Sequence, residues 1–139
     1  MNTPNIAFIG TGIMGAPMAQ NLLKAGYPVI VHTRTKNKAQ SVLDAGAQWA
    51  DSPAGAAKGV DVVILCVPDT SDVKAVLLGS NGVIESAAEG MICIDMSTIS
   101  PEATKQIAQR LQQKGIILLD APISGGQIGA IEAKLSIMI

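Results

Sequence analysis

The stretch Ile6-Ala7-Phe8-Ile9-Gly10-Thr11-Gly12-Ile13-Met14-Gly15 decides the fold of this chain. A short apolar run leads directly into the pattern G-x-G-x-x-G, and an amphipathic helical pattern follows it. Gly10 allows a sharp turn, Gly12 lets the backbone approach a pyrophosphate, and Gly15 permits close packing of the helix on the strand. Strand, tight turn and helix in this order predict a dinucleotide-binding loop.

The backbone N–H groups of Ile13 and Met14 are expected to point at the phosphates, where the helix dipole favours an anion. The alternative interpretation is a glycine-rich turn that binds no ligand. A Walker-type nucleotide site is disfavoured, because no Gly-Lys-Ser/Thr sequence follows the loop.

Further short apolar runs recur along the chain, and most are continuous rather than alternating, as in strands covered on both faces. Helical patterns separate them, which is typical of βαβ units. We therefore expect an α/β fold: a Rossmann-type doubly wound, mostly parallel sheet with helices on both faces, forming one dinucleotide-binding domain over residues 1–139. The other runs are Val29–Val31, Val62–Val67, Met91–Ile94, Ile116–Leu119 and Leu135–Ile139.

Local signals mark where the helices begin and end. Ser52-Pro53 and Ser100-Pro101 each predict an N-cap followed by proline at the first helical position. The segment Thr70-Ser71-Asp72 is expected to cap a helix that ends near Leu78. Three glycines follow helical stretches, where a left-handed residue closes the helix: Gly26, Gly46 and Gly115.

The composition excludes several classes of function. The net charge is −1 and only three residues are aromatic. The chain therefore offers neither a positive electrostatic field nor a base-stacking surface for nucleic acid. Cys66 and Cys93 lie in apolar runs and are expected to be buried thiols, and one histidine, His32, makes no metal site. No run is long enough to span a membrane, and the first residues lack the basic start of a signal peptide. We expect a soluble, cytoplasmic protein.

The end of the second predicted strand bears on the choice of cofactor. An acid at this position would select NAD, but no carboxylate occurs before Asp44. Arg34 stands there instead, and its guanidinium suits a 2′-phosphate. We expect NADP(H), with NAD still open, and take Thr33, Arg34 and Thr35 as cofactor-binding residues. The alternative is that Arg34 is only a solvated loop residue.

The chain resembles the cofactor-binding domain of the β-hydroxyacid dehydrogenases. That family includes 3-hydroxyisobutyrate dehydrogenase, tartronate semialdehyde reductase and glyoxylate/succinic semialdehyde reductases, with 6-phosphogluconate dehydrogenase as a more distant relative. Four blocks carry the resemblance, in the family's order and over nearly the whole chain: residues 8–26, 67–69, 94–101 and 120–138.

The resemblance implies hydride transfer between a nicotinamide cofactor and a small β-hydroxyacid or its semialdehyde. It implies that Val67 and Pro68 lie beside the cofactor's ribose and that Thr98 contacts the nicotinamide half. It further implies that a substrate carboxylate is held by Ser124, Gly125 and Gly126.

In the family, a lysine on a second, all-helical domain serves as general acid and base, and no segment of this sequence corresponds to it. Lys134 stands where the family usually has threonine and is not that lysine, so we assign no catalytic residue. Ala133 stands where the family usually has glycine, and its Cβ disfavours a positive φ.

The chain ends within an apolar run, Leu135–Ile139. This run is either an edge strand that completes the sheet or the point at which a longer protein is truncated. Two functions therefore remain open: the cofactor half of an oxidoreductase that binds cofactor without turnover, and a stand-alone dinucleotide-binding module that senses redox state or is structural. A homodimer, or a separate helical chain that supplies the lysine, is a further alternative.

Overall fold

Six parallel strands form the sheet in the computed structural model, which describes residues 3–139. The first two residues belong to the N-terminal segment that lacks the basic start of a signal peptide, and they lie outside the described residues. The spatial order is β3-β2-β1-β4-β5-β6, which is that of a dinucleotide-binding doubly wound sheet. The predicted fold class is therefore confirmed. The strands are β1 (Ile6–Ile9), β2 (Val29–His32), β3 (Gln48–Trp49), β4 (Val62–Leu65), β5 (Ile92–Asp95) and β6 (Ile117–Asp120).

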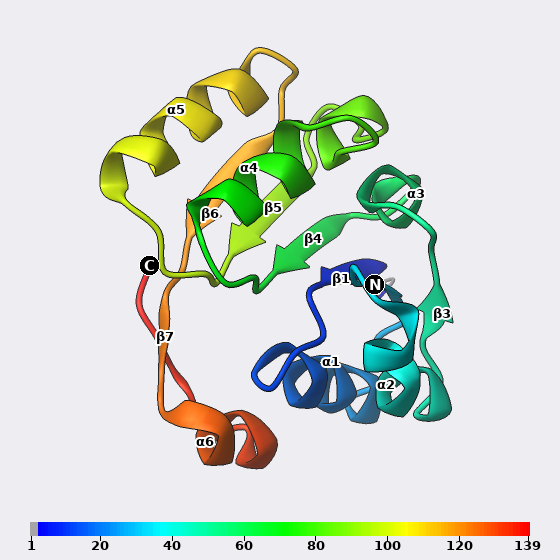
Figure 1. Cartoon of the computed structure of the whole chain (residues 1–139). Helices are drawn as coiled ribbons and strands as arrows, with labels where there is room; N and C mark the ends of the chain where they lie inside the picture. Colours follow the sequence, from blue (N-terminus) through cyan, green and yellow to red (C-terminus); the bar gives the residue numbers. More distant parts are fainter. Residues whose placement is uncertain (1–2) are drawn as a thin grey trace.

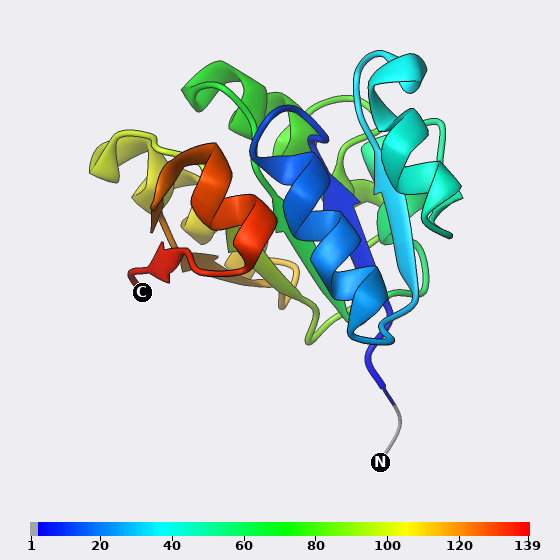
Figure 2. The same cartoon turned by 90° about the horizontal axis from the view of Figure 1, so that it is seen from below.

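Helices cover both faces of this sheet, as Figures 1 and 2 show. Strand β1 explains why the apolar runs are continuous: Ala7 and Ile9 face one core, while Ile6 and Phe8 face the other. One face carries α3 (Pro53–Ala57), α4 (Thr70–Leu78), α5 (Pro101–Gln112) and the 3-10 turn η2 (Val83–Glu85), and the other carries α1 (Gly15–Lys24), the 3-10 turn η1 (Lys36–Ala39), α2 (Gln40–Asp44) and α6 (Gly126–Glu132).

Two of the three predicted helix caps form as expected. The Ser52 hydroxyl accepts a hydrogen bond from the Gly55 N–H at 2.9 Å, and the Ser100 hydroxyl accepts one from the Ala103 N–H at 3.2 Å. The predicted cap of α4 is wrong by one residue, because Asp69 precedes the helix and its carboxylate accepts from the Ser71 N–H at 2.8 Å. The predicted left-handed closures are confirmed at Gly26, Gly46 and Gly115.

Of the two alternatives for Leu135–Ile139, the edge strand that completes the main sheet is wrong. Only β8 (Ser136–Ile137) is a strand, and it pairs antiparallel with β7 (Ile123–Ser124) in a separate two-stranded sheet. The main sheet ends at β6 on this side. The opposite edge of the main sheet is β3, a short strand that the sequence pattern did not reveal.

Candidate functional site

The strand register brings every predicted cofactor loop to one edge of the sheet. Ile9 pairs with His32 on one side and Leu65 on the other, and Asp95 pairs with Leu65 and Asp120. These residues are the last of their strands, so the loops that follow them all leave the carboxyl edge. In open parallel sheets this edge is where ligands bind.

The glycine loop after β1 has three glycines in three different surroundings. Gly10 is buried with φ +96°, and a Cβ there would lie 2.2 Å from the Cys66 carbonyl oxygen. A Cβ on Gly15 would lie 1.8 Å from the Gly10 carbonyl oxygen, so this glycine lets α1 pack against the loop. Gly12 is exposed, and a Cβ there would have no neighbour within 4 Å. The open space beside Gly12 fits a ligand that approaches the backbone closely, as a pyrophosphate does.

The first turn of α1 leaves backbone donors beside this space. Its first helical bond runs from the Ala16 N–H to the Gly12 carbonyl at 3.0 Å. The N–H groups of Ile13 and Met14 precede this bond and therefore have no acceptor within the helix. The Ile13 side chain is 70% exposed. Free donors at a helix start suit an anion, as expected from the sequence.

Thr11 joins the glycine loop to the loop that follows β2, a link that the sequence analysis did not foresee. The residue is buried, and its hydroxyl donates to the Lys38 carbonyl at 3.2 Å. Twenty-seven residues separate the two partners, so no local pattern marks the bond. It fixes the glycine loop relative to the segment that carries Arg34.

The loop after β2 places Arg34 at the predicted position, exposed at the carboxyl edge. Its guanidinium donates to the Asp72 carboxylate in the first turn of α4, so the arginine is paired rather than isolated. Thr33 is half-buried and Thr35 is exposed beside it. His32 packs on the strand, where its Nδ1 lies 2.9 Å from the Ala50 carbonyl oxygen and donates to it. That contact agrees with a packing role.

A buried polar chain connects the loops after β4 and β5. The Val67 N–H donates to the Ser97 hydroxyl at 2.9 Å, and the Ser97 N–H donates to Asp95 Oδ1 at 2.9 Å. Asp95 is 1% exposed, and its Oδ2 has no hydrogen-bond partner among the described residues. Burial raises the pKa of the Asp95 carboxyl, the hydrogen bonds from Ser97 lower it, and the charge of Asp120 raises it.

The hydrogen bonds that join Val67, Ser97 and Asp95 lie beside three predicted cofactor-binding residues. Val67 is half-buried, while Pro68 and Thr98 are exposed at the carboxyl edge. Cys66, which precedes Val67, was expected to be buried but is only half-buried. Burial raises the pKa of its thiol, with the Asp95 charge as a second cause. Cys93 is fully buried, as expected, and burial raises the pKa of its thiol to about 12. Neither thiol is disposed to ionise at neutral pH.

The predicted substrate loop lies at the end of β7. Ser124, Gly125 and Gly126 are all exposed, and both glycines have positive φ, at +133° and +64°. Helix α6 follows and rests against α1, where the Asn21 side-chain amide donates to the Ala130 carbonyl at 2.7 Å. Figure 2 shows the two helices side by side.

Helix α6 ends on a strained residue. Ala133 adopts the left-handed conformation, with φ +58° and ψ +41°, in which its Cβ is unfavourable. The backbone thus adopts the positive φ that was expected to be disfavoured at Ala133.

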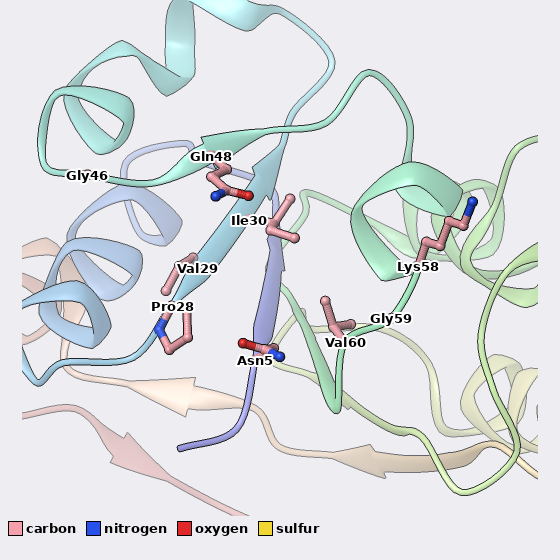
Figure 3. Close-up of a pocket in the computed structure, with 9 residues that line it drawn as sticks. All are labelled: Asn5, Pro28, Val29, Ile30, Gly46, Gln48, Lys58, Gly59 and Val60. Atoms are coloured by element: carbon pink, nitrogen blue, oxygen red, sulfur yellow. The ribbon is translucent and has the colours of Figure 1, made fainter. Parts of the chain in front are cut away.

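A shallow hollow of about 270 Å³ lies at the opposite, amino edge of the sheet (Figure 3). Of the nine described residues that line it, only Lys58 is charged, and its ammonium points away from the hollow in Figure 3. The hollow is therefore separate from the loops at the carboxyl edge and lacks an inward-pointing charge for a dinucleotide phosphate. Its lining consists of Asn5, Pro28, Val29, Ile30, Gly46, Gln48, Lys58, Gly59 and Val60.

Residues 3–139 contain neither a candidate membrane span nor a candidate metal cluster. None of the helices in that range is both long and apolar enough to cross a membrane. Over the same residues, His, Cys, Asp and Glu side chains do not gather in groups of three or more that could hold a metal ion.

Comparisons with known proteins identify the family of the chain. The family model of the NAD binding domain of 6-phosphogluconate dehydrogenase matches residues 5–139, so the chain belongs to this family of NAD-binding domains. The resemblance drawn from the sequence is thereby confirmed. The chain is 42% identical to the 2-hydroxy-3-oxopropionate reductase of Escherichia coli (strain K12). The match covers 96% of this chain and 46% of the reductase.

Two solved structures have the same fold. A Mycobacterium tuberculosis 3-hydroxyisobutyrate dehydrogenase with L-serine matches 99% of this chain and 46% of its own, at 34% identity and a TM-score of 0.91. A protein in complex with NADP+ and 2-OPP matches 95% of this chain and 47% of its own, at 31% identity and a TM-score of 0.90. The chain spans about half the length of the curated relatives it matches.

Proposed function

We propose that this chain binds NADP(H) at the carboxyl edge of the sheet, as the cofactor-binding half of an oxidoreductase. The observation that carries the proposal is the glycine loop, where Gly10 and Gly15 are closed by backbone contacts and Gly12 alone is open. A nicotinamide cofactor supplies the hydride chemistry when bound, and the chain's own residues hold and orient it.

Each predicted cofactor residue then has a role. The glycine loop, Gly10, Gly12, Ile13, Met14 and Gly15, receives the pyrophosphate. Thr33, Arg34 and Thr35 lie at the adenine ribose, where the Arg34 guanidinium favours a 2′-phosphate. On the other side of β1, Val67, Pro68 and Thr98 line the ribose and nicotinamide half.

The substrate class that we propose is a small β-hydroxyacid or its semialdehyde. The exposed Ser124 hydroxyl and the backbone N–H groups of Gly125 and Gly126 suit a carboxylate. The names of the relatives support this class, since 2-hydroxy-3-oxopropionate is a small semialdehyde acid and L-serine is a small β-hydroxyacid.

We assign no catalytic residue to this chain, and we propose that it binds cofactor without turning over a substrate by itself. The general acid and base would come from a helical domain, supplied by the same protein or by another chain. Large apolar side chains on and after α6 are exposed and suit such a neighbour: Ile128, Ile131, Ile137, Met138 and Ile139. An assay of NADPH oxidation with a panel of small semialdehydes tests this point, and turnover by the 139-residue chain would contradict it.

The cofactor preference is tested by Arg34→Asp, with NADPH and NADH titrated into each protein. The wild type should bind NADPH more tightly, and the variant should prefer NADH. Lys58→Asp makes the same change in charge at the amino edge and should leave the preference as it is. Unchanged relative affinities in Arg34→Asp would show that Arg34 does not contact the 2′-phosphate.

A further inference from the structure

Arg34 and Asp72 form an ion pair at the adenosine end of the candidate site. Thirty-eight residues separate them in sequence, and the fold brings them together because the loop after β2 and the start of α4 leave the same edge of the sheet. The pair consists of one hydrogen bond, from Arg34 Nη2 to Asp72 Oδ1. The residue expected to bind a 2′-phosphate thus already has an anionic partner.

Asp72 is the fixed member of this pair. Its other carboxylate oxygen, Oδ2, accepts from the Asp69 N–H at 3.3 Å and closes the capping box of α4. Its side chain is 16% exposed, whereas that of Arg34 is 81% exposed. The carboxylate is therefore held by the helix start, while the long arginine side chain is free to move toward a ligand.

The Arg34 side chain is 81% exposed, and Asp72 is the hydrogen-bond partner of its guanidinium among the described residues. A guanidinium has five N–H donors and binds a phosphate best through two parallel bonds. Asp72 neutralises part of the guanidinium charge and holds the side chain toward α4, so a phosphate that takes two of the other donors binds a cation already shared with a carboxylate. A ribose 2′-hydroxyl has no negative charge and can donate to a carboxylate, as in sites that select NAD.

We propose that Asp72 sets the balance between NADP(H) and NAD(H) by competing with the 2′-phosphate for Arg34. The inference rests on the proposed cofactor-binding function and adds a second specificity residue to it. Arg34 favours the phosphorylated cofactor, and Asp72 weakens that preference without abolishing it.

The test is Asp72→Asn, which removes the charge but keeps a side-chain oxygen that can accept from the Asp69 N–H. The probes are adenosine 2′,5′-bisphosphate and 5′-AMP, which differ by the 2′-phosphate alone, followed by NADPH and NADH. Exposed ion pairs of this kind shift equilibria by up to about fivefold. We expect Asp72→Asn to tighten the bisphosphate and NADPH by about three- to fivefold and to leave 5′-AMP and NADH within about twofold.

Asp69→Asn is the matched control, since it removes a neighbouring carboxylate that does not contact Arg34. The main partner of Asp69 is Ser71, whose N–H and hydroxyl both donate to its Oδ1 at 2.8 Å. These hydrogen bonds lower the pKa of the Asp69 carboxyl, and the charge of Arg34 is the smallest of the causes. Asparagine is also an effective N-cap, so α4 should still form. Asp69→Asn should change the ratio of the two affinities by less than about twofold.

A double-mutant cycle separates competition for Arg34 from simple repulsion. In an Arg34→Ala background, Asp72→Asn should no longer tighten the bisphosphate, because nothing is left to compete for. The proposal is overturned if Asp72→Asn leaves the ratio unchanged in a folded protein, if Asp69→Asn has the same effect, or if the effect persists without Arg34. A wild type that binds none of the probes overturns the proposed function as well, which separates the two failures.

Discussion

Gly12 and Gly15 offer a matched pair of alanine substitutions, because the added methyl group meets nothing at one position and backbone at the other. At Gly12 the new Cβ has no heavy atom within 4 Å. At Gly15 it lies 1.8 Å from the Gly10 carbonyl oxygen and 3.2 Å from Cε1 of the buried Phe8 ring, and Cβ atoms essentially never approach within 3.0 Å. Gly12→Ala therefore tests the ligand space, and Gly15→Ala tests the packing of α1 on the loop.

The two variants should differ in their free energy of unfolding. Gly12→Ala should leave the free energy of unfolding unchanged or raise it by up to about 1 kcal/mol, through reduced freedom of the unfolded chain. Gly15→Ala should lower it by about 2 kcal/mol or more, as overpacking does. Loss of hydrogen bonds to a charged group costs about 1.5–3 kcal/mol, so cofactor affinity should fall about tenfold to 100-fold in Gly12→Ala.

Urea unfolding followed by circular dichroism measures the stabilities, and titration of NADPH fluorescence measures the affinities. The informative result is a Gly12→Ala protein that is as stable as the wild type and binds poorly. Wild-type affinity in that variant would mean that no phosphate lies against Gly12. A large loss of stability in Gly12→Ala, or none in Gly15→Ala, would contradict the loop geometry.

Two further predictions concern strain and burial. Ala133→Gly should raise the free energy of unfolding by about 1 kcal/mol, because it relieves the left-handed Ala133; urea unfolding measures this, and a loss of stability would contradict the strained turn. The raised pKa of Asp95 means that its protonated form stabilises the fold below the ordinary value of 3.8 and that this contribution is lost as pH rises through the folded-state pKa. Asp95→Asn should remove this loss, so the stability of the wild type relative to Asp95→Asn should fall with rising pH, and parallel stability curves for the two proteins would contradict the assignment.

The main strands were predictable because each buried run has both faces covered. In β1, β4 and β5 alternate side chains face the two cores, so the runs are apolar on both faces. Strand β3 escaped prediction because it has two residues, one of them the exposed Gln48, and is defined by its pairing with β2. The pairing of Leu135–Ile139 with β7 was not predicted, since the apolar character of the run does not specify which strand it pairs with.

The glycine loop was predictable for a similar reason: its pattern encodes local sterics, and each glycine occupies the environment expected of it. The polar contacts of the site were not, because they join distant loops. Thr11 reaches Lys38, and Arg34 reaches Asp72, over 27 and 38 residues. The α4 cap was off by one because Asp69, Ser71 and Asp72 are all acceptable capping residues, and only the backbone decides among them.

The central claim is that the carboxyl edge of the sheet binds a nicotinamide dinucleotide, and calorimetric titration of the folded 139-residue chain tests it most directly. NADPH and NADH are titrated separately at the same ionic strength, since the phosphate contacts depend on salt. We predict saturable binding of both cofactors, tighter for NADPH. A chain that is folded by circular dichroism and gives no heat and no saturation with either cofactor would contradict the claim.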